Sequence, residues 1–312
     1  MRKLEFQPQF AEALRRCNMP VIITGATGWL GQAALEMFHS ALGDQFPARV
    51  TAFAARPRRI ALRGGGNIDV HSLPDIASFD LPGALVFHLA FLTREHASAQ
   101  PIDAYIAANR QISADIRAFL KRCGASGIFI PSSGAARFGT LEDNPYGALK
   151  REDEEEFAAL AADLAIPAAF IRVFNLAGPF INKRDSYALA CILSDISQGG
   201  PVALRAAHPV WRGFAHVQDV LNIALGCLQN GLSPPVFDTC GEPIEIGDLA
   251  ARAATLLTGR LIPIQRPEWE AGPADRYLGD AAAFNALAAQ LQIPLHGLDA
   301  QIRDTATYLA TA

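Results

Sequence analysis

This sequence of 312 residues lacks long hydrophobic runs and paired cysteines, and both absences exclude classes of protein. No stretch of about 18 uncharged apolar residues occurs, so we expect neither a membrane span nor a signal peptide. The five cysteines lie far apart without a CxxC pair, which argues against a disulfide framework or a zinc site and favours free thiols in the cytoplasm. The seven histidines show no metal-ligand spacing, so no metal ion is expected.

An excess of one charge is also missing. The net charge is −4 at pH 7, so no broad basic field would attract nucleic acid or anionic lipid. Half of the residues are hydrophobic and 19% are charged, a composition typical of a globular protein with one large domain or two joined ones. Any anionic ligand must therefore be bound by local groups.

Short apolar runs alternate with longer segments of helical period, which is typical of parallel βαβ units. The predicted strands are 20–24, 49–54, 67–70, 84–89, 127–131, 168–173 and 235–239, and the longer predicted helices are 32–39, 102–122 and 146–164. We therefore predict an α/β fold, a Rossmann-like doubly wound parallel sheet with a small discontinuous C-terminal lobe. The sheet domain would comprise residues 1–177 and about 212–242, and the lobe 178–211 and 243–312.

A glycine-rich turn follows the first predicted strand, in the sequence TGATGWLG at residues 24–31. Its G-x-x-G-x-x-G spacing permits a tight turn, a close backbone approach to a pyrophosphate, and helix packing on the strand, with the helix N-terminus aimed at phosphate. The strand before it and the helix after it are the context that a dinucleotide site requires. The expected cofactor-binding residues of this turn are Gly25, Thr27, Gly28, Trp29, Leu30 and Gly31.

The segment after the second strand bears on which dinucleotide is bound. An NAD site would usually have Asp or Glu there, on the ribose hydroxyls. This chain has no carboxylate but three arginines, Arg56, Arg58 and Arg59, whose guanidinium groups could hold a 2′-phosphate. The alternative is a solvated basic loop. We expect Arg56 to contact the cofactor, and we prefer NADP over NAD, with NAD left open.

Tyr146 and Lys150 lie four residues apart at the start of a predicted helix, with Asn144 as N-cap and Pro145 in the first turn. This spacing places both side chains on one helical face. A tyrosine acts as acid or base near neutral pH only if its pKa falls from ~10 by about three units, to which a nearby ammonium and a helix N-terminus contribute. The pair is therefore a candidate catalytic and cofactor-binding pair. The alternative is a surface tyrosine beside an unrelated lysine.

Together these features resemble the extended short-chain dehydrogenase/reductase superfamily, in its NAD(P)-dependent nucleotide-sugar epimerase/dehydratase branch. The resemblance covers nearly the whole chain. Further matching motifs are HLA at 88–90, YIAANRQIS around Asn109, SSGAARFG at 132–139, RVFNLAGP at 172–179 and RGFAHVQDV at 212–220.

The resemblance implies roles for single residues. Leu89 and Ala90 would line the cofactor, and Asn109 matches the family's helix asparagine at the cofactor site. Asn175 would face the substrate, and Arg212 would meet a nucleotide diphosphate. The family also implies a homodimer formed through the helices 102–122 and 146–164.

Three departures from the family pattern matter. The serine motif is one residue longer than usual, so we prefer Ser133 as the catalytic hydroxyl, with Ser132 as the fallback and as a substrate-binding residue. Gly134 and Ala135 stand where the family's dehydratases have Asp-Glu, so dehydration is not expected. Residues 201–210 lack the family's Gly-Asp-Gly turn, so the nucleotide base cannot be inferred.

The leading hypothesis is hydride transfer on a nucleotide-linked sugar, at C4, by a 4-epimerase or a 4-ketoreductase, with a slight preference for the reductase. Tyr146 would exchange the hydroxyl proton, Ser133 would bond the same oxygen, and Lys150 would hold the nicotinamide ribose. A dinucleotide-binding sensor without chemistry is the alternative. The acidic run at 152–156 is interpreted as a solvated helix face.

Overall fold

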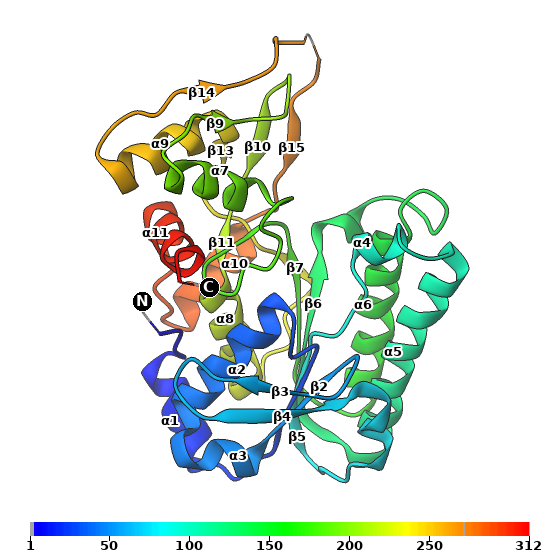
Figure 1. The fold of residues 1–312 in the computed structure, drawn as a ribbon. Coiled ribbons are helices and arrows are strands. Elements are labelled where there is room, and N and C mark those ends of the chain that lie inside the picture. The colour runs from blue at the N-terminus through cyan, green and yellow to red at the C-terminus, as the bar shows by residue number, and fades with distance from the viewer. Residues whose placement is uncertain (1–2, 271, 312) are drawn as a thin grey trace. The chain divides into compact units, whose positions relative to one another are not determined.

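The computed structural model describes residues 3–270 and 272–311. These residues form two compact units. The sheet unit comprises residues 3–173 and 221–237. The lobe comprises residues 174–220 and 238–311. The order of the elements along the chain can be followed in Figure 1.

An eight-stranded sheet in the order β12-β7-β6-β5-β1-β2-β4-β3 forms the centre of the sheet unit. Neighbouring strands from β4 to β7 pair in parallel, and β3 is antiparallel to β4. The strands are β1 (Val21–Thr24), β2 (Val50–Ala54), β3 (Arg58–Ala61), β4 (Asn67–Ser72), β5 (Ala84–His88), β6 (Ala125–Ser133), β7 (Ala168–Val173) and β12 (Phe237–Asp238). The order reverses at β1, because the chain proceeds outward to β2 and then crosses to β5 on the other side.

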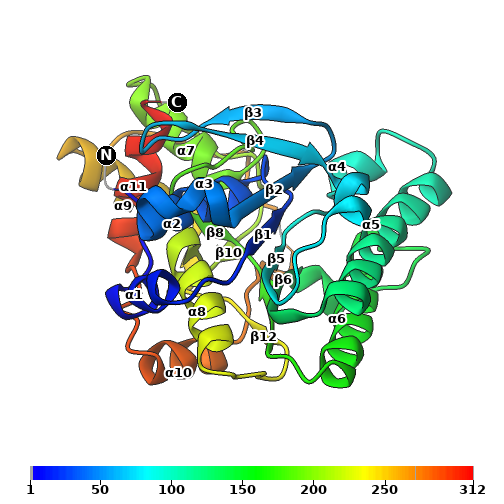
Figure 2. The same ribbon diagram turned by 90° about the horizontal axis from the view of Figure 1, so that it is seen from below.

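Helices cover both faces of this sheet, as Figures 1 and 2 show. α1 and α2 pack together on one face, and the long pair α5 and α6 on the other. The helices of the unit are α1 (Pro8–Arg16), α2 (Trp29–Leu42), α3 (Phe46–Arg49), α4 (Arg94–Ala97), α5 (Ile102–Cys123) and α6 (Pro145–Asp163), and α8 (Val217–Gln229) enters it from Leu221 on. On the α5–α6 face, buried aromatic and aliphatic side chains such as Phe119 and Phe157 pack against Val86 and Ile128 of the sheet. Burial on both faces explains why these strands are nearly continuous apolar runs.

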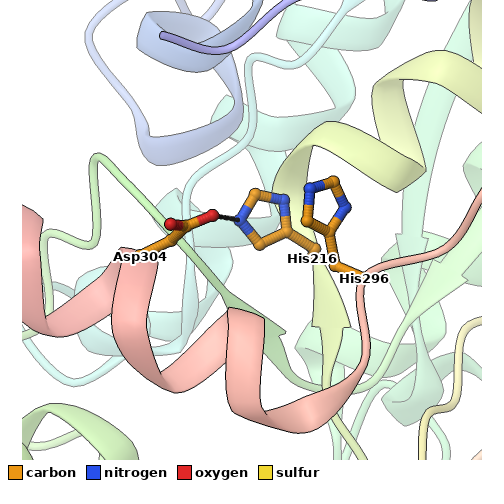
Figure 3. Close-up of side chains that lie close together, drawn as sticks. All are labelled: His216, His296 and Asp304. Carbon is orange, nitrogen blue, oxygen red and sulfur yellow. Dashed lines mark ion pairs between the residues drawn. The ribbon is translucent and has the colours of Figure 1, made fainter. Parts of the chain in front are cut away.

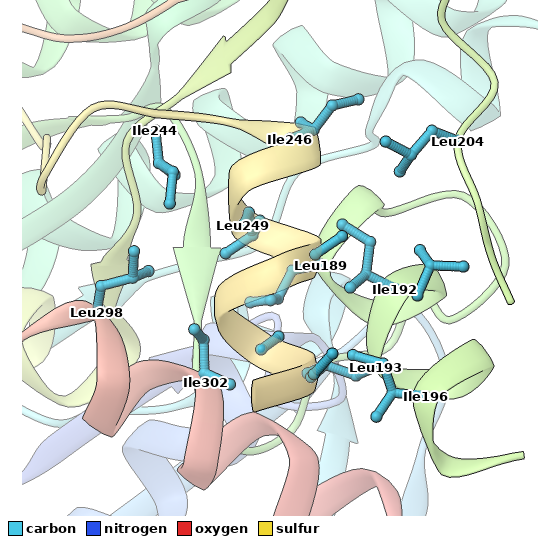
Figure 4. Close-up of a cluster of buried hydrophobic side chains, with 14 of the residues drawn as sticks. Leu189, Ile192, Leu193, Ile196, Leu204, Ile244, Ile246, Leu249, Leu298 and Ile302 are labelled. Carbon is cyan, nitrogen blue, oxygen red and sulfur yellow. The ribbon is translucent and has the colours of Figure 1, made fainter. Parts of the chain in front are cut away.

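The lobe has a hydrophobic core of its own, shown in Figure 4. This core includes Leu189, Ile192, Leu249 and Ile302, which come from three helices that pack against one another. Its helices are α7 (Ala188–Ser197), α9 (Ile246–Thr258), α10 (Ala282–Gln290) and α11 (Leu298–Leu309), and its strands are β8 (Leu176–Ala177), β9 (Val202–Ala203), β10 (Val210–Arg212), β11 (Ala215–His216), β13 (Ile244–Glu245), β14 (Ile264–Gln265) and β15 (Asp275–Tyr277). The strands are only two or three residues long and form small separate sheets.

The predicted α/β fold with its parallel sheet is confirmed, and each predicted strand has a counterpart within a few residues. The short strands of the lobe were not predicted, and neither was one strand of the large sheet. Arg58 and Arg59 lie on the edge strand β3, not in a loop, and Arg59 is 3.8 Å from Asp69 of β4. Among the described residues, no helix combines the length and apolarity needed to cross a membrane.

Candidate active site

The glycine turn connects β1 to α2 at the carboxyl edge of the sheet. Gly25 has a φ of +66°, and a Cβ at this position would lie 2.6 Å from the backbone of Leu89 and Ala90. At Gly31 a Cβ would lie 2.1 Å from the carbonyl oxygen of Gly25. At Gly28 the nearest atom, the same oxygen, is 3.3 Å away. The first glycine thus lets two strand ends meet, and the third lets the helix pack on the turn.

The backbone of Leu89 and Ala90 is fixed by Thr24 at the end of β1. Both N–H groups donate to Thr24 Oγ1 at 3.1 Å, which leaves the hydroxyl proton for His88 Nδ1 at 2.8 Å. Burial lowers the pKa of His88 to about 3, helped by the charge of Lys150, so the ring is neutral. Through Thr24, His88 therefore helps to fix the backbone of Leu89 and Ala90, the expected wall of the candidate cofactor site.

The N-terminus of α2 faces this wall. Gly28 is its N-cap residue and has no side chain that could cap the helix. Gln32 donates to the carbonyl of Thr27 at 3.1 Å and so holds the turn that precedes Trp29 and Leu30. A helix N-terminus next to a close backbone approach fits the pyrophosphate of a dinucleotide. After β2, Arg56 is exposed, and it stands nearest to the strand end of the three arginines.

Tyr146 lies in the first turn of α6, where a local network fixes the helix start. Asn144 accepts a hydrogen bond from Gly147 N at 3.2 Å and donates to the carbonyls of Ala135 and Phe138. The segment after β6 is thereby bound to the helix that carries Tyr146 and Lys150. The predicted N-cap role of Asn144 is confirmed.

Lys150 is buried, with 6% of its surface exposed. Its Nζ donates to the carbonyl of Pro131 at 2.9 Å and lies 3.7 Å from the centroid of the Phe91 ring. Burial lowers its pKa to about 8, and the charges of Asp153 and Glu154 oppose this shift. The ring of Phe91 also meets that of Tyr146 edge-on, with centroids 5.7 Å apart. Phe91 thus contacts both members of the candidate pair.

Phe91 was not identified from the sequence. It directly follows the HLA motif, so an aromatic residue at the end of a parallel strand was the available signal. Asn109 holds the next residue: its Oδ1 accepts from Leu92 N at 2.8 Å, and its Nδ2 bonds the carbonyls of Tyr105 and Leu92. Asn109 therefore orients the segment that carries Phe91.

The two serines at the end of β6 have different partners. The Ser132 hydroxyl donates to the buried carboxylate of Glu154. Ser133 Oγ accepts from the N–H of Ala135 at 3.2 Å and begins the short helical turn Gly134–Arg137. The Ser132 proton is thus used inside the sheet unit, and the choice of Ser133 as the catalytic hydroxyl stays a prediction.

The interpretation of residues 152–156 as a solvated face is wrong for two of the five. Asp153 and Glu154 are each only 4% exposed. Glu154 receives two hydrogen bonds from Arg172 of β7, at 2.8 and 2.6 Å. Glu152 and Glu156 do lie outside, where they pair with arginines of α5. Helical periodicity turns the middle of the run inward, and its charged composition concealed this.

Two of the three candidate substrate residues, Asn175 and Arg212, belong to the lobe. Asn175 is 7% exposed, and its Nδ2 donates to the carbonyls of Gly213 and Tyr277, both at 3.3 Å. Arg212 on β10 forms an ion pair with Asp275 of β15 at 2.7 Å. Asn175 thus ties the start of the lobe to the strand pair that carries Arg212.

A histidine cluster of the lobe is shown in Figure 3. His216 and His296 stack with centroids 4.2 Å apart, and His216 Nε2 lies 3.5 Å from Asp304. The N–H of Gln218 donates to His216 Nδ1, so the neutral ring carries its proton on Nε2, toward Asp304. His296 Nδ1 is 2.6 Å from Asp219. This proton arrangement suits a packing role and opposes metal ligation by His216 Nε2, which needs a free lone pair there.

Comparison with known proteins places the chain in a family. The model of the NAD dependent epimerase/dehydratase family matches residues 21–240, so the chain belongs to this family. No curated protein sequence matches significantly.

Many solved structures are similar in fold. One is a UDP-N-acetylglucosamine 4-epimerase from Methanobrevibacter ruminantium M1, at 17% identity and a TM-score of 0.71, with 94% of this chain and 98% of that chain covered. Another is a UDP-glucose 4-epimerase from Stenotrophomonas maltophila with bound NAD, at 19% identity and a TM-score of 0.71, with the same coverage. A third is an NAD-dependent NDP-hexosamine 5,6-dehydratase of tunicamycin biosynthesis, at 20% identity and a TM-score of 0.70, with 95% and 99% covered. At these identities the likeness establishes the fold.

Proposed function

We propose that this protein transfers hydride to or from C4 of a nucleotide-linked sugar, as a 4-ketoreductase or a 4-epimerase. The observation that carries the proposal is the arrangement around Lys150: a buried ammonium one helical turn after Tyr146, with Phe91 in contact with both. Membership of the NAD dependent epimerase/dehydratase family supports the same chemistry. The solved relatives named above are described as acting on nucleotide sugars, which supports a substrate of this class.

Each residue has a role that its position supports. Tyr146 exchanges a proton with the C4 oxygen, as a phenolate when the sugar is oxidised and as a phenol when the ketone is reduced. Lys150, one turn away, stabilises the phenolate by its charge and holds the nicotinamide ribose. Ser133 donates a hydrogen bond to the C4 oxygen. Asn175 and Arg212 of the lobe bind the sugar nucleotide, with Arg212 on the diphosphate.

The cofactor is a nicotinamide dinucleotide, which accepts or supplies the hydride when bound. The glycine turn at Gly25–Gly31 and the N-terminus of α2 fit its pyrophosphate, since the glycines permit a close backbone approach and a helix N-terminus offers N–H donors, and Leu89 and Ala90 lie beside the same turn. We prefer NADP, because Arg56 follows β2 and no carboxylate does. The family and the relatives that hold NAD keep NAD as the alternative.

Incubation with NADPH or NADH and a panel of nucleotide sugars and nucleotide-linked 4-keto sugars tests the proposal, with product masses and absorbance at the nicotinamide band as readouts. A reductase changes the absorbance stoichiometrically, whereas an epimerase converts substrate without net oxidation. Tight dinucleotide binding without conversion of any substrate would favour the sensor alternative.

The Tyr146→Phe variant tests the mechanism. It removes the hydroxyl that exchanges the proton, so we expect turnover to fall by roughly 10²–10⁴-fold while the dinucleotide dissociation constant stays within a few-fold. Tyr308→Phe on α11 is the matched control and should retain turnover. Near-normal turnover by Tyr146→Phe would contradict the proposed mechanism.

A further inference from the structure

Asp153 is a buried carboxylate on α6, close to Lys150. Its Oδ1 accepts a hydrogen bond from Ser113 of α5 at 2.5 Å. Its Oδ2 is buried, and in the described part of the chain no N–H or O–H group lies within hydrogen-bond distance of it. A buried carboxylate with one unsatisfied oxygen destabilises a fold by itself, so it calls for a compensating interaction.

The charge of Lys150 opposes the effect of burial on this carboxylate. Lys150 precedes Asp153 by three residues on the same helix, a spacing at which side chains are neighbours on the surface of the helix. Phe91, which lies over the Lys150 ammonium, and Asp153 both line one small cavity of about 10 Å³, together with Asn109 and Ser113. The ring that contacts the ammonium and the Asp153 carboxylate thus border the same cavity.

The other ionisable groups around Lys150 are neutral, positive or paired elsewhere. The charge of Glu154 on α6 also opposes the effect of burial on Lys150, but Arg172 bonds this carboxylate twice. His88 on β5 is neutral, because burial lowers its pKa to about 3. Tyr146 on α6 is an uncharged phenol until it gives up its proton. Arg117 on α5 adds positive charge near Asp153 and is itself paired with Glu156.

We propose that Asp153 is a positioning residue whose carboxylate keeps the buried Lys150 ammonium charged and oriented for the dinucleotide ribose. The inference rests on the proposed function for the role of Lys150, but the charge coupling itself can be measured without substrate or cofactor. Burial raises the pKa of Asp153, and the charge of Lys150 lowers it again. Each group thus opposes the effect of burial on the other.

The test is a direct titration of Lys150. The chain has only four lysines, so protein labelled with ¹³C at the lysine ε-carbon gives few resonances, and Lys150→Arg identifies the one from Lys150. We expect a wild-type midpoint near pH 8. In Asp153→Asn, which keeps the shape and can still bond Ser113, we expect the midpoint to fall by about one pH unit, since a nearby opposite charge is lost.

Glu155→Gln is the matched control. Glu155 is an exposed acid on the same helix, so its replacement changes the net charge equally and should leave the Lys150 midpoint in place. An unchanged midpoint in Asp153→Asn would overturn the proposal, because it would mean that Asp153 is already uncharged beside Lys150.

A second readout separates this inference from the proposed function. The NADPH dissociation constant is measured from pH 6.5 to 9.5 for the wild type and both variants. We expect the loss of affinity at high pH to begin about one unit lower in Asp153→Asn than in Glu155→Gln. If the wild type binds no dinucleotide, the proposed function fails. The Lys150 titration would still show whether the Asp153 carboxylate keeps the Lys150 ammonium charged.

Discussion

Helix α6 carries two neighbouring acids that are equally buried but differently surrounded. Glu154 accepts two hydrogen bonds from Arg172 and one from Ser132, so partners from β6 and β7 satisfy both of its oxygens. Asp153 points toward α5, where Ser113 bonds one of its oxygens. The two side chains therefore lie on different sides of one helix: Glu154 faces the sheet, and Asp153 faces α5.

The difference between them separates a structural group from a functional one. A buried ion pair with full hydrogen bonding fixes the geometry of the elements that it joins, here α6 on the sheet. A buried acid with an unsatisfied oxygen beside a desolvated lysine instead changes the charge state of its neighbour. Groups of this second kind are typical of sites that do chemistry.

The largest effect on stability is expected when the buried ion pair between Arg172 and Glu154 is broken. Arg172→Ala would leave Glu154 buried without its cation, so we expect the free energy of unfolding to fall by about 3–5 kcal/mol, measured by urea denaturation. Arg110→Ala is the control, because it breaks the exposed pair with Glu152 and should change stability by less than about 1 kcal/mol. Equal losses of stability in the two variants would show that the buried pair contributes no more to stability than the exposed pair.

A smaller change of opposite sign in the free energy of unfolding is expected when Lys150 is replaced. Lys150→Met replaces a buried charge by an apolar chain, so we expect a gain of about 1–3 kcal/mol in the free energy of unfolding near neutral pH and a loss of turnover. The pKa of Lys150 is lower in the folded than in the unfolded chain, so the wild type becomes more stable as the pH rises above about 8. The advantage of Lys150→Met should therefore shrink between about pH 8 and 10.5.

Chemical denaturation at a series of pH values measures this difference. Comparison of the two proteins at each pH cancels the other groups that titrate in the same range. A constant difference across the range would contradict a depressed pKa of Lys150.

The sequence was sufficient for the parts of the site that depend on backbone geometry. The glycine spacing, the strand alternation and the Asn144 cap each follow from local conformational preferences, and each lies where it was predicted. The edge strand β3 was missed, because its side chains are mostly exposed and give no alternating apolar pattern. The consecutive glycines at 64–66, between β3 and β4, were the available signal for a hairpin.

The sequence was insufficient where a role depends on partners from distant elements. Asp153 and Glu154 lie in a run of five acids, and nothing local shows that Ser113 and Arg172 meet two of them in the interior. A helical-wheel argument places Asp153 near the face of Lys150, but the direction of that face depends on how α5 and α6 pack. Phe91 was missed for the same reason, since it follows β5 whereas its partners Tyr146 and Lys150 come from α6.

The smallest effects on stability are expected at the two serines, which extend the same comparison to β6. Ser132→Ala removes one of the three hydrogen bonds to Glu154, so we expect a loss of about 1 kcal/mol in stability and turnover within a few-fold of the wild type. Ser133→Ala removes the acceptor for Ala135 N, with an expected loss of stability of similar size, but turnover should fall at least about tenfold if its hydroxyl meets the C4 oxygen. Each variant is the control for the other. Steady-state kinetics with the substrate identified in the panel would show the reverse order if Ser132 were the catalytic hydroxyl, and the contact of Ser132 with Glu154 would then have to break in the substrate complex.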